Sequence, residues 1–263
     1  MITYFNYIVF VGIAILLIVS AMVLFDKNTL IKKTIYSLLA AYSLFFLIFI
    51  LLIWSELGRA PLRTLGETRL WYAFFIPILI LVLYYKNSWK WIVPYGSMMA
   101  IVFLIINAVK PENFSKELMP ALQSVWFAPH VIVYIFSYAI FGMVTLLSFY
   151  QLFLAKIKKW EDWSINADKL IYTGFAFLTL GLLFGAIWAK QAWGHYWTWD
   201  PKEVWALITW MIYLIYVHYR IAFKPEYSFA AKLLIIAFIL LLLCWFGINY
   251  MPIASQSVHT YGR

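Results

Sequence analysis

The chain has 263 residues, of which 65% are hydrophobic and only 12% are charged, and its mean hydropathy is +0.86. Soluble domains are about half apolar and about a quarter charged, so this composition excludes them and indicates a polytopic membrane protein. The net charge of +9 is interpreted as a topology signal, because Lys and Arg accumulate in the cytoplasmic loops of membrane proteins. We therefore expect an all-α fold, one membrane domain over residues 1–263, contact with lipid, and no nucleic-acid partner.

Eight apolar segments approach the length of about 20 residues that a helix needs to cross a bilayer. They are residues 5–25, 34–54, 70–85, 91–109, 130–154, 169–189, 202–221 and 230–249. The first shows no signal-peptide cleavage pattern and is expected to be retained. The third is short and contains Pro77, which packing against neighbouring helices can accommodate. Residues 1–109 are expected to form an N-terminal four-helix part, followed by a second part over 110–263.

The distribution of Lys and Arg predicts the orientation of these spans. Alternate connections, beginning with the one after the first span, carry more basic residues than the others. The positive-inside rule places the more basic set in the cytoplasm. Both termini and the connection between the sixth and seventh spans are then predicted to face outward.

The connection at residues 193–203 is unusually aromatic, with the sequence Trp-Gly-His-Tyr-Trp-Thr-Trp-Asp-Pro-Lys-Glu. A single Trp at a membrane surface usually acts as an anchor, and we expect this of Trp71, Trp89, Trp91 and Trp160. Three Trp residues around a flexible Gly194 instead favour a platform for a flat apolar ligand, because each ring can bury about 150–250 Å². Haem is the ligand that suits such a platform best.

The end of this connection has the pattern of a helix start. Asp200 can cap the helix, Pro201 fits its first position, and Glu203 stands where a capping box requires it. Capping alone would account for Asp200 and Glu203. The functional interpretation adds that this cap fixes the angle at which the Trp residues are presented.

Four histidines are candidate ligands, namely His130, His195, His218 and His259. His130 and His259 lie on the predicted face of the aromatic connection, and two imidazoles facing each other there would give haem two axial ligands. His218 lies within the seventh span, where an ionisable group suggests function, although a position at the cytoplasmic interface is the alternative. His195 is either a ligand or an exposed loop residue. The only cysteine, Cys244, excludes an internal disulfide and a Cys-x-x-Cys-His attachment site.

Residues 193–210, continuing to Arg220, closely resemble the WWD signature of the CcsA/ResC cytochrome c biogenesis proteins. Supporting matches are residues 122–126 leading to His130, and residues 249–262 around His259. The first half resembles the family only loosely, in hydropathy and over residues 58–67. The Pro-Lys-Glu-Val-Trp-Ala continuation differs from the endings of the related CcmC and CcmF types.

The resemblance implies that His130 and His259 ligate non-covalent haem b at the outer surface and that His218 belongs to a second, inner haem site. Residues 110–263 would then be the haem-handling part, with the WWD loop at 193–203. The loop residues implied in haem binding are Trp193, Gly194, Trp197, Trp199 and Asp200. His195 falls on a variable position and receives no role, and Ser257-Val258 stands where many members have Gly-Leu.

The function that this resemblance implies is to carry haem outward and present it for thioether attachment to the Cys-x-x-Cys-His segment of apocytochrome c. The chain would act with a ResB/CcsB-type membrane partner, as a subunit of a cytochrome c synthase (haem lyase) complex. The expected location is a bacterial inner or plasma membrane, or a plastid-type one, with thiol-reducing proteins as further candidate partners. The alternatives are a haem exporter or chaperone without a role in attachment, a non-haem transporter with an aromatic gate, and a structural subunit.

Overall fold

The structure is a computed structural model that describes residues 4–109, 114, 116–154, 161–223, 227–252 and 257. It contains eight helices long and apolar enough to cross a membrane and, within the described ranges, no strand. The predicted all-α membrane fold is therefore confirmed. The chain divides into two compact units, Met1–Leu118 and Met119–Arg263, which are described separately.

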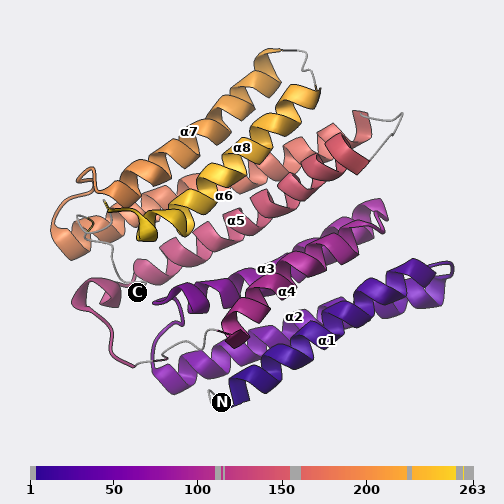
Figure 1. Cartoon of the computed structure of the whole chain (residues 1–263). Coiled ribbons are helices and arrows are strands. Elements are labelled where there is room, and N and C mark those ends of the chain that lie inside the picture. Colours follow the sequence, from indigo (N-terminus) through magenta and orange to yellow (C-terminus); the bar gives the residue numbers. More distant parts are fainter. Residues whose placement is uncertain are drawn as a thin grey trace. The chain divides into compact units, whose positions relative to one another are not determined.

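Unit 1 contains the first four helices (Figure 1). They are α1 (Phe5–Met22, continued by the 3-10 turn Val23–Phe25), α2 (Thr29–Leu57), α3 (Leu65–Asn87) and α4 (Ile92–Val109). The third span is longer than expected, since α3 already begins at Leu65. Its first turns carry Glu67 and Arg69, which lowered its apparent hydropathy, but both side chains are buried inside the unit.

The proline inside α3 is accommodated by a neighbouring helix. Pro77 has no N–H, so the carbonyl of Ala73, four residues earlier, loses its helical donor. The hydroxyl of Tyr42 on α2 donates to this oxygen at 3.2 Å, in the buried core of the unit. The helix therefore continues through Pro77 without an exposed backbone group in the apolar layer.

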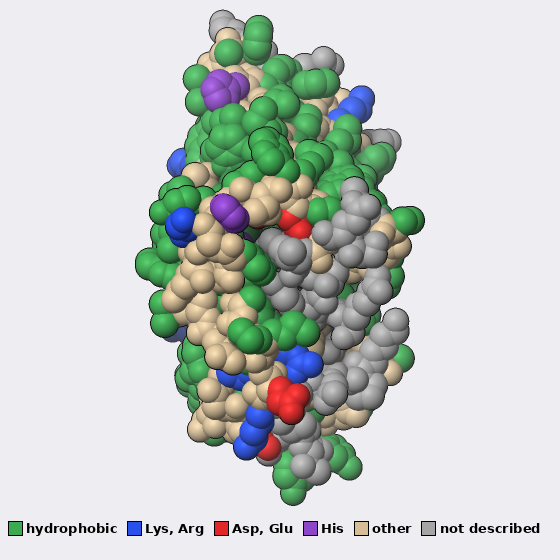
Figure 2. All heavy atoms as spheres, turned by 90° about the vertical axis from the view of Figure 1, so that its left-hand side faces the viewer, with side chains coloured by type: hydrophobic (Ala, Val, Ile, Leu, Met, Phe, Trp, Pro, Cys, Tyr) green, Lys and Arg blue, Asp and Glu red, His purple; other side chains and the backbone are tan. Residues whose placement is uncertain are grey.

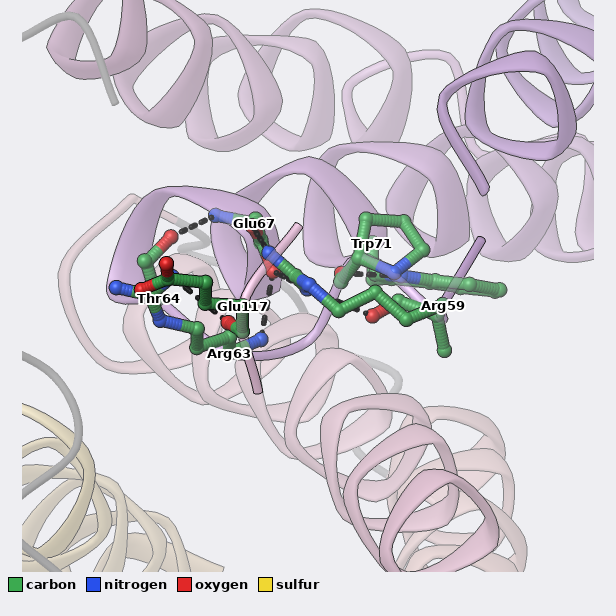
Figure 3. Close-up of polar contacts among 8 residues, drawn as sticks. Arg59, Arg63, Thr64, Glu67, Trp71 and Glu117 are labelled. Carbon is green, nitrogen blue, oxygen red and sulfur yellow. Dashed lines mark hydrogen bonds and ion pairs between the residues drawn. The ribbon is translucent and has the colours of Figure 1, made fainter. Parts of the chain in front are cut away.

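A polar cluster closes the α2–α3 connection in unit 1 (Figure 3). The guanidinium of Arg59 donates to both carboxylate oxygens of Glu67, at 2.7 and 2.9 Å, and the backbone N–H of Arg63 donates to the same carboxylate at 2.6 Å. The hydroxyl of Thr64 caps α3 by accepting from the N–H of Glu67. The indole of Trp71 donates to the carbonyl of Pro61 and is 5% exposed. Trp71 is therefore a packed core residue, and its prediction as an interface anchor was wrong.

Unit 2 contains the other four helices. They are α5 (Phe127–Phe149, followed by the π-helical turn Tyr150–Leu154), α6 (Glu161–Trp193), α7 (Pro201–Ala222) and α8 (Tyr227–Trp245), with short 3-10 turns at Pro120–Gln123 and Gly247–Tyr250. The rings of Phe141 and Tyr213 stack in its core with centroids 3.7 Å apart. Within this unit, the α6–α7 connection, the start of α5 and the end of α8 lie at the same end of the bundle (Figure 1).

Candidate functional site

The aromatic connection begins as the last turn of α6. Trp193 is the final helical residue, and Gly194 then takes a φ of +86°, a left-handed conformation that glycine adopts without strain. The ammonium of Lys190 donates to the carbonyl of Gly194 at 2.7 Å and lies 5.5 Å from the centre of the Tyr196 ring. A cation at this position suits the negative end of the helix dipole. The turn after α6 is therefore fixed by its own side chains.

The start of α7 is a complete capping box, as predicted from the sequence. Oδ1 of Asp200 accepts from the N–H of Lys202 at 2.8 Å, and Oε2 of Glu203 accepts from the N–H of Asp200 at 3.1 Å. Asp200 is 6% exposed, so this cap is buried rather than solvated. The helix start thus gives the connection a rigid base.

The Trp residues of this connection have different environments. Trp193 packs against Trp188 of α6, with ring centroids 5.0 Å apart. Trp197 is half-buried, and its Nε1–H is buried without a hydrogen-bond acceptor among the described residues. Trp199 is 69% exposed and stands edge-on to Trp197. The indole of Trp193 is therefore packed, that of Trp197 has a donor without an acceptor among the described residues, and that of Trp199 projects outward.

His130 lies in the first turn of α5 and is seated against α6. Its Nδ1 is 2.8 Å from the carbonyl oxygen of Gly181. Because a carbonyl only accepts, this contact assigns the proton to Nδ1 and the lone pair of the neutral ring to Nε2. A Cβ on Gly185 would lie 2.7 and 2.8 Å from two ring atoms of His130, so any larger residue would require the ring to move. The hydrogen bond to Gly181 fixes the tautomer, and the close contact with Gly185 helps to fix the orientation of the ring.

An aromatic chain links His130 to the WWD connection. The His130 ring lies 5.4 Å from Trp188, which in turn contacts Trp193. Trp188 is buried and donates from its indole to the carbonyl of Ala121, just before α5. We did not predict Trp188, Gly181 or Gly185 from the sequence. The Gly-x-x-x-Gly spacing was a readable signal of close helix packing, although it does not identify the residue packed against it.

His259 lies outside the described residues. Ser257, two positions earlier, is described and is 6% exposed. Its hydroxyl donates to Oδ1 of Asp200 at 2.9 Å, so the cap of α7 also holds a residue of the C-terminal segment. His195 is exposed in the connection, in keeping with the absence of an assigned role. The side chains visible in Figure 2 are mainly hydrophobic, with a few charged groups and exposed histidines.

His218 lies near the far end of α7 and is exposed. Its Nδ1 is 2.9 Å from the carbonyl of Leu214, which again assigns the lone pair to Nε2. The opposite face of α7 is fixed to α6, because Asp168 accepts from Arg220 at 2.5–3.0 Å and from the hydroxyl of Tyr216 at 2.8 Å. This clamp turns His218 away from the unit. His130 lies in the first turn of α5 and His218 near the end of α7. Because the starts of α5 and α7 lie at the same end of unit 2 (Figure 1), the two histidines lie at opposite ends of this bundle and cannot share one ligand.

Chemically, the end of unit 2 near the aromatic connection offers an oriented imidazole, packed and exposed indoles, and a buried indole donor. Such a set can hold a flat apolar ring system that contains a metal and carries an acceptor at its edge. No group of three or more His, Cys, Asp or Glu side chains capable of holding a metal ion by itself occurs among the residues described.

Comparisons with known proteins show the family to which the chain belongs. A family model described as Cytochrome C assembly protein matches residues 3–254. The chain is 36% identical over 264 residues to the Cytochrome c biogenesis protein CcsA of Chlamydomonas reinhardtii, a match that covers 94% of this chain and 72% of that protein. It is 30% identical over 248 residues to CcsA of Cuscuta reflexa, covering 80% and 79% of the two chains.

A solved structure, the Cytochrome c Heme Lyase CcmF, matches with a TM-score of 0.66 at 17% identity. The match covers 93% of this chain and 46% of that one, and at this identity it shows a shared fold only. The family match spans all eight helices and the WWD connection. The chain therefore belongs to the CcsA family of cytochrome c biogenesis proteins, and its role lies in cytochrome c maturation.

Proposed function

We propose that the chain binds haem b without a covalent bond at the WWD end of unit 2 and presents it for attachment to apocytochrome c. The observation that carries this proposal is the hydrogen bond between His130 and the Gly181 carbonyl. The bond from Nδ1 to the Gly181 carbonyl leaves the lone pair on Nε2, the arrangement found when a histidine ligates a metal. The residues Trp193, Gly194, Trp197, Trp199 and Asp200 belong to the connection at this end of unit 2 and would form the platform.

Two further features fit a porphyrin. The buried Nε1–H of Trp197 has no acceptor among the described residues, and a buried donor costs free energy until one arrives. A propionate oxygen of haem would supply that acceptor. His259 would provide the second axial ligand, because Ser257 binds Asp200 at the start of α7 and His259 is two residues further along the chain.

The attachment itself requires addition rather than redox chemistry at the ring. Each thiol of the Cys-x-x-Cys-His segment adds across a vinyl group of haem, with sulfur bonding to one carbon and hydrogen to the other. This chain's contribution is to hold the ring, orient it and leave its vinyl edge accessible. The incoming His of apocytochrome c would replace one of the two histidine ligands. Reduction of the thiols beforehand would fall to separate thiol-reducing proteins.

We also propose that His218 belongs to an inner site completed by a ResB/CcsB-type partner. His218 continues an outward stripe on α7 with the exposed Ile208, Met211 and Ile215. An imidazole facing lipid is unfavourable, and ionisable groups within a membrane usually find a protein partner. A partner helix on this stripe would shield His218 and supply the second ligand. Haem would then move outward to His130, with the WWD connection on the extracytoplasmic face of a bacterial or plastid-type membrane.

The test is haem retention in protein co-purified with its membrane partner. We expect a Soret band in the wild type, a several-fold smaller or shifted band in His130→Ala and His259→Ala, and partial restoration by imidazole. His195→Ala is the matched control, because His195 is an exposed histidine of the same connection, and it should keep the wild-type spectrum. Full haem and normal cytochrome c yield in both ligand variants would refute the outer site. Loss of haem without loss of thioether product would favour an exporter or chaperone instead.

The inner site is tested separately by His218→Ala. We expect less haem at the outer site, since transit would be interrupted. Normal outer occupancy in this variant would show that haem reaches His130 by another route.

A further inference from the structure

Trp199 has a backbone conformation that its side chain disfavours. Its φ is +59°, in the left-handed region that bulky residues rarely occupy. Gly and Asn adopt this conformation more readily, because the former lacks a Cβ and the latter can hydrogen-bond locally. A connection that served only to join α6 and α7 would be more stable with either of those residues. The Trp at this position is therefore a feature that stability alone does not explain.

The carboxylate of Glu203 holds this conformation in place. Its Oε2 accepts from the N–H of Thr198 at 2.8 Å and from the N–H of Asp200 at 3.1 Å. These N–H groups belong to the residues immediately before and after Trp199, and the N–H of Trp199 itself lies between them. A capping box requires only the second bond. The first, shorter bond reaches beyond the cap and draws the two flanking amides toward one oxygen atom.

The result is an outward projection of the Trp199 side chain. The indole is 69% exposed, and it stands at 86° to the ring of Trp197 with centroids 5.8 Å apart. This edge-on pair has one member packed into the unit and the other directed away from it. The two indoles thus present two different surfaces to a ligand.

We infer that Glu203 is a positioning residue that holds Trp199 in its strained, exposed conformation as a contact for the planar ligand. The inference rests on the proposed function, which supplies haem as that ligand. It assigns Glu203 a role beyond helix capping, although Glu203 itself touches no ligand. It also implies that stability and function conflict at residue 199.

The conflict is tested by two substitutions that both remove the indole. Trp199→Ala keeps a Cβ in the left-handed conformation, whereas Trp199→Asn is tolerated there. We expect the Asn variant to melt about 2–4 °C above the Ala variant in detergent, while both lose haem retention and cytochrome c yield several-fold. Tyr196→Ala, which removes another exposed aromatic of the same connection, is the control and should keep both haem retention and cytochrome c yield. Wild-type haem retention and cytochrome c yield in the two Trp199 variants would overturn the inference.

The role of Glu203 is tested by comparing Glu203→Gln with Glu203→Ala. The amide oxygen of Gln can still accept from both backbone N–H groups, so we expect near-normal haem retention and an unshifted Soret band. Ala removes the acceptor and should reduce retention several-fold. Equal behaviour of the two variants would contradict the positioning role. If wild-type protein holds no haem at all, the proposed function fails, while the melting and cytochrome c comparisons at residue 199 still decide the inference.

Discussion

Two helix starts in this chain share one sequence pattern but use it differently. α3 begins Thr64-x-x-Glu67 and α7 begins Asp200-x-x-Glu203, each with a capping residue followed by Glu at the third helical position. Glu67 is completely buried and is bound by Arg59 and by the backbone of Arg63 (Figure 3). Among the residues that the structure describes, the bonds to Glu203 come from N–H and hydroxyl groups of its own connection.

The difference separates a cluster whose polar groups satisfy one another from a region that we propose to be completed by a ligand. Around Glu67, the ion pair and the hydrogen bonds satisfy one another, and the adjacent Trp71 is buried. Beside Glu203, Trp199 is strained and exposed, and Trp197 holds a buried donor without a described acceptor. Polar groups that satisfy one another's hydrogen bonds indicate a structural role. A strained backbone and a buried donor without a described acceptor suggest instead that a ligand completes the region.

The largest expected effect is the loss of stability in Glu67→Ala. This change leaves the buried guanidinium of Arg59 without its carboxylate, which costs about 3–5 kcal/mol for a buried ion pair. Unfolding in detergent should show it as a much lower midpoint. Glu203→Ala is the matched comparison and should cost only about 1–2 kcal/mol, the scale of a lost helix cap, because its carboxylate binds N–H and hydroxyl groups of the exposed connection. Equal losses of stability in the two variants would contradict the proposed difference between these helix starts.

The sequence was sufficient for the features that depend on local pattern. The eight spans and the capping box at Asp200 follow from hydropathy and from residues close together in the chain, and both were confirmed. The early start of α3 was missed because Glu67 is neutralised by Arg59, and hydropathy alone does not include that pairing. Trp71 was misassigned for the same kind of reason, since its acceptor is the carbonyl of Pro61.

The candidate site depended more strongly on contacts between distant residues. His130 was identified by its place in the sequence, but its seat on Gly181 and Gly185 arises only when α5 packs on α6. The left-handed backbone of Trp199 runs against the preference of its own side chain, so no propensity argument could predict it. The ligand roles of His130, His218 and His259 stay predictions.

Gly185→Ala is expected to reduce stability less than Glu67→Ala does, but to reduce haem retention more. The added methyl would meet the His130 ring at 2.7–2.8 Å, so the ring must move. Overpacking of this kind costs about 1–3 kcal/mol, and the displaced imidazole should lower haem retention several-fold. Gly174→Ala is a close steric control, because its methyl would lie 2.8 Å from Phe141 in the same helix pair. If both variants lose haem equally, general distortion of the α5–α6 pair is responsible rather than the seat of His130.

The smallest effect on stability is expected of Ser257→Ala, which removes the hydroxyl that donates to Asp200. One hydrogen bond of this kind contributes about 1 kcal/mol, and the cap of α7 remains because the N–H of Lys202 still binds the same oxygen. We expect the melting temperature to fall by only about 2–4 °C, but the Soret band to be weakened or shifted, since the segment that leads to His259 would lose its anchor. Ser257→Thr keeps the hydroxyl and should behave like the wild type.

Combining Ser257→Ala with Asp200→Asn should reduce haem retention by less than the two single changes added together, because both changes disrupt one shared bond. Strict additivity in haem retention would show that the anchor and the cap act independently, and the C-terminal histidine would then owe its position to other contacts.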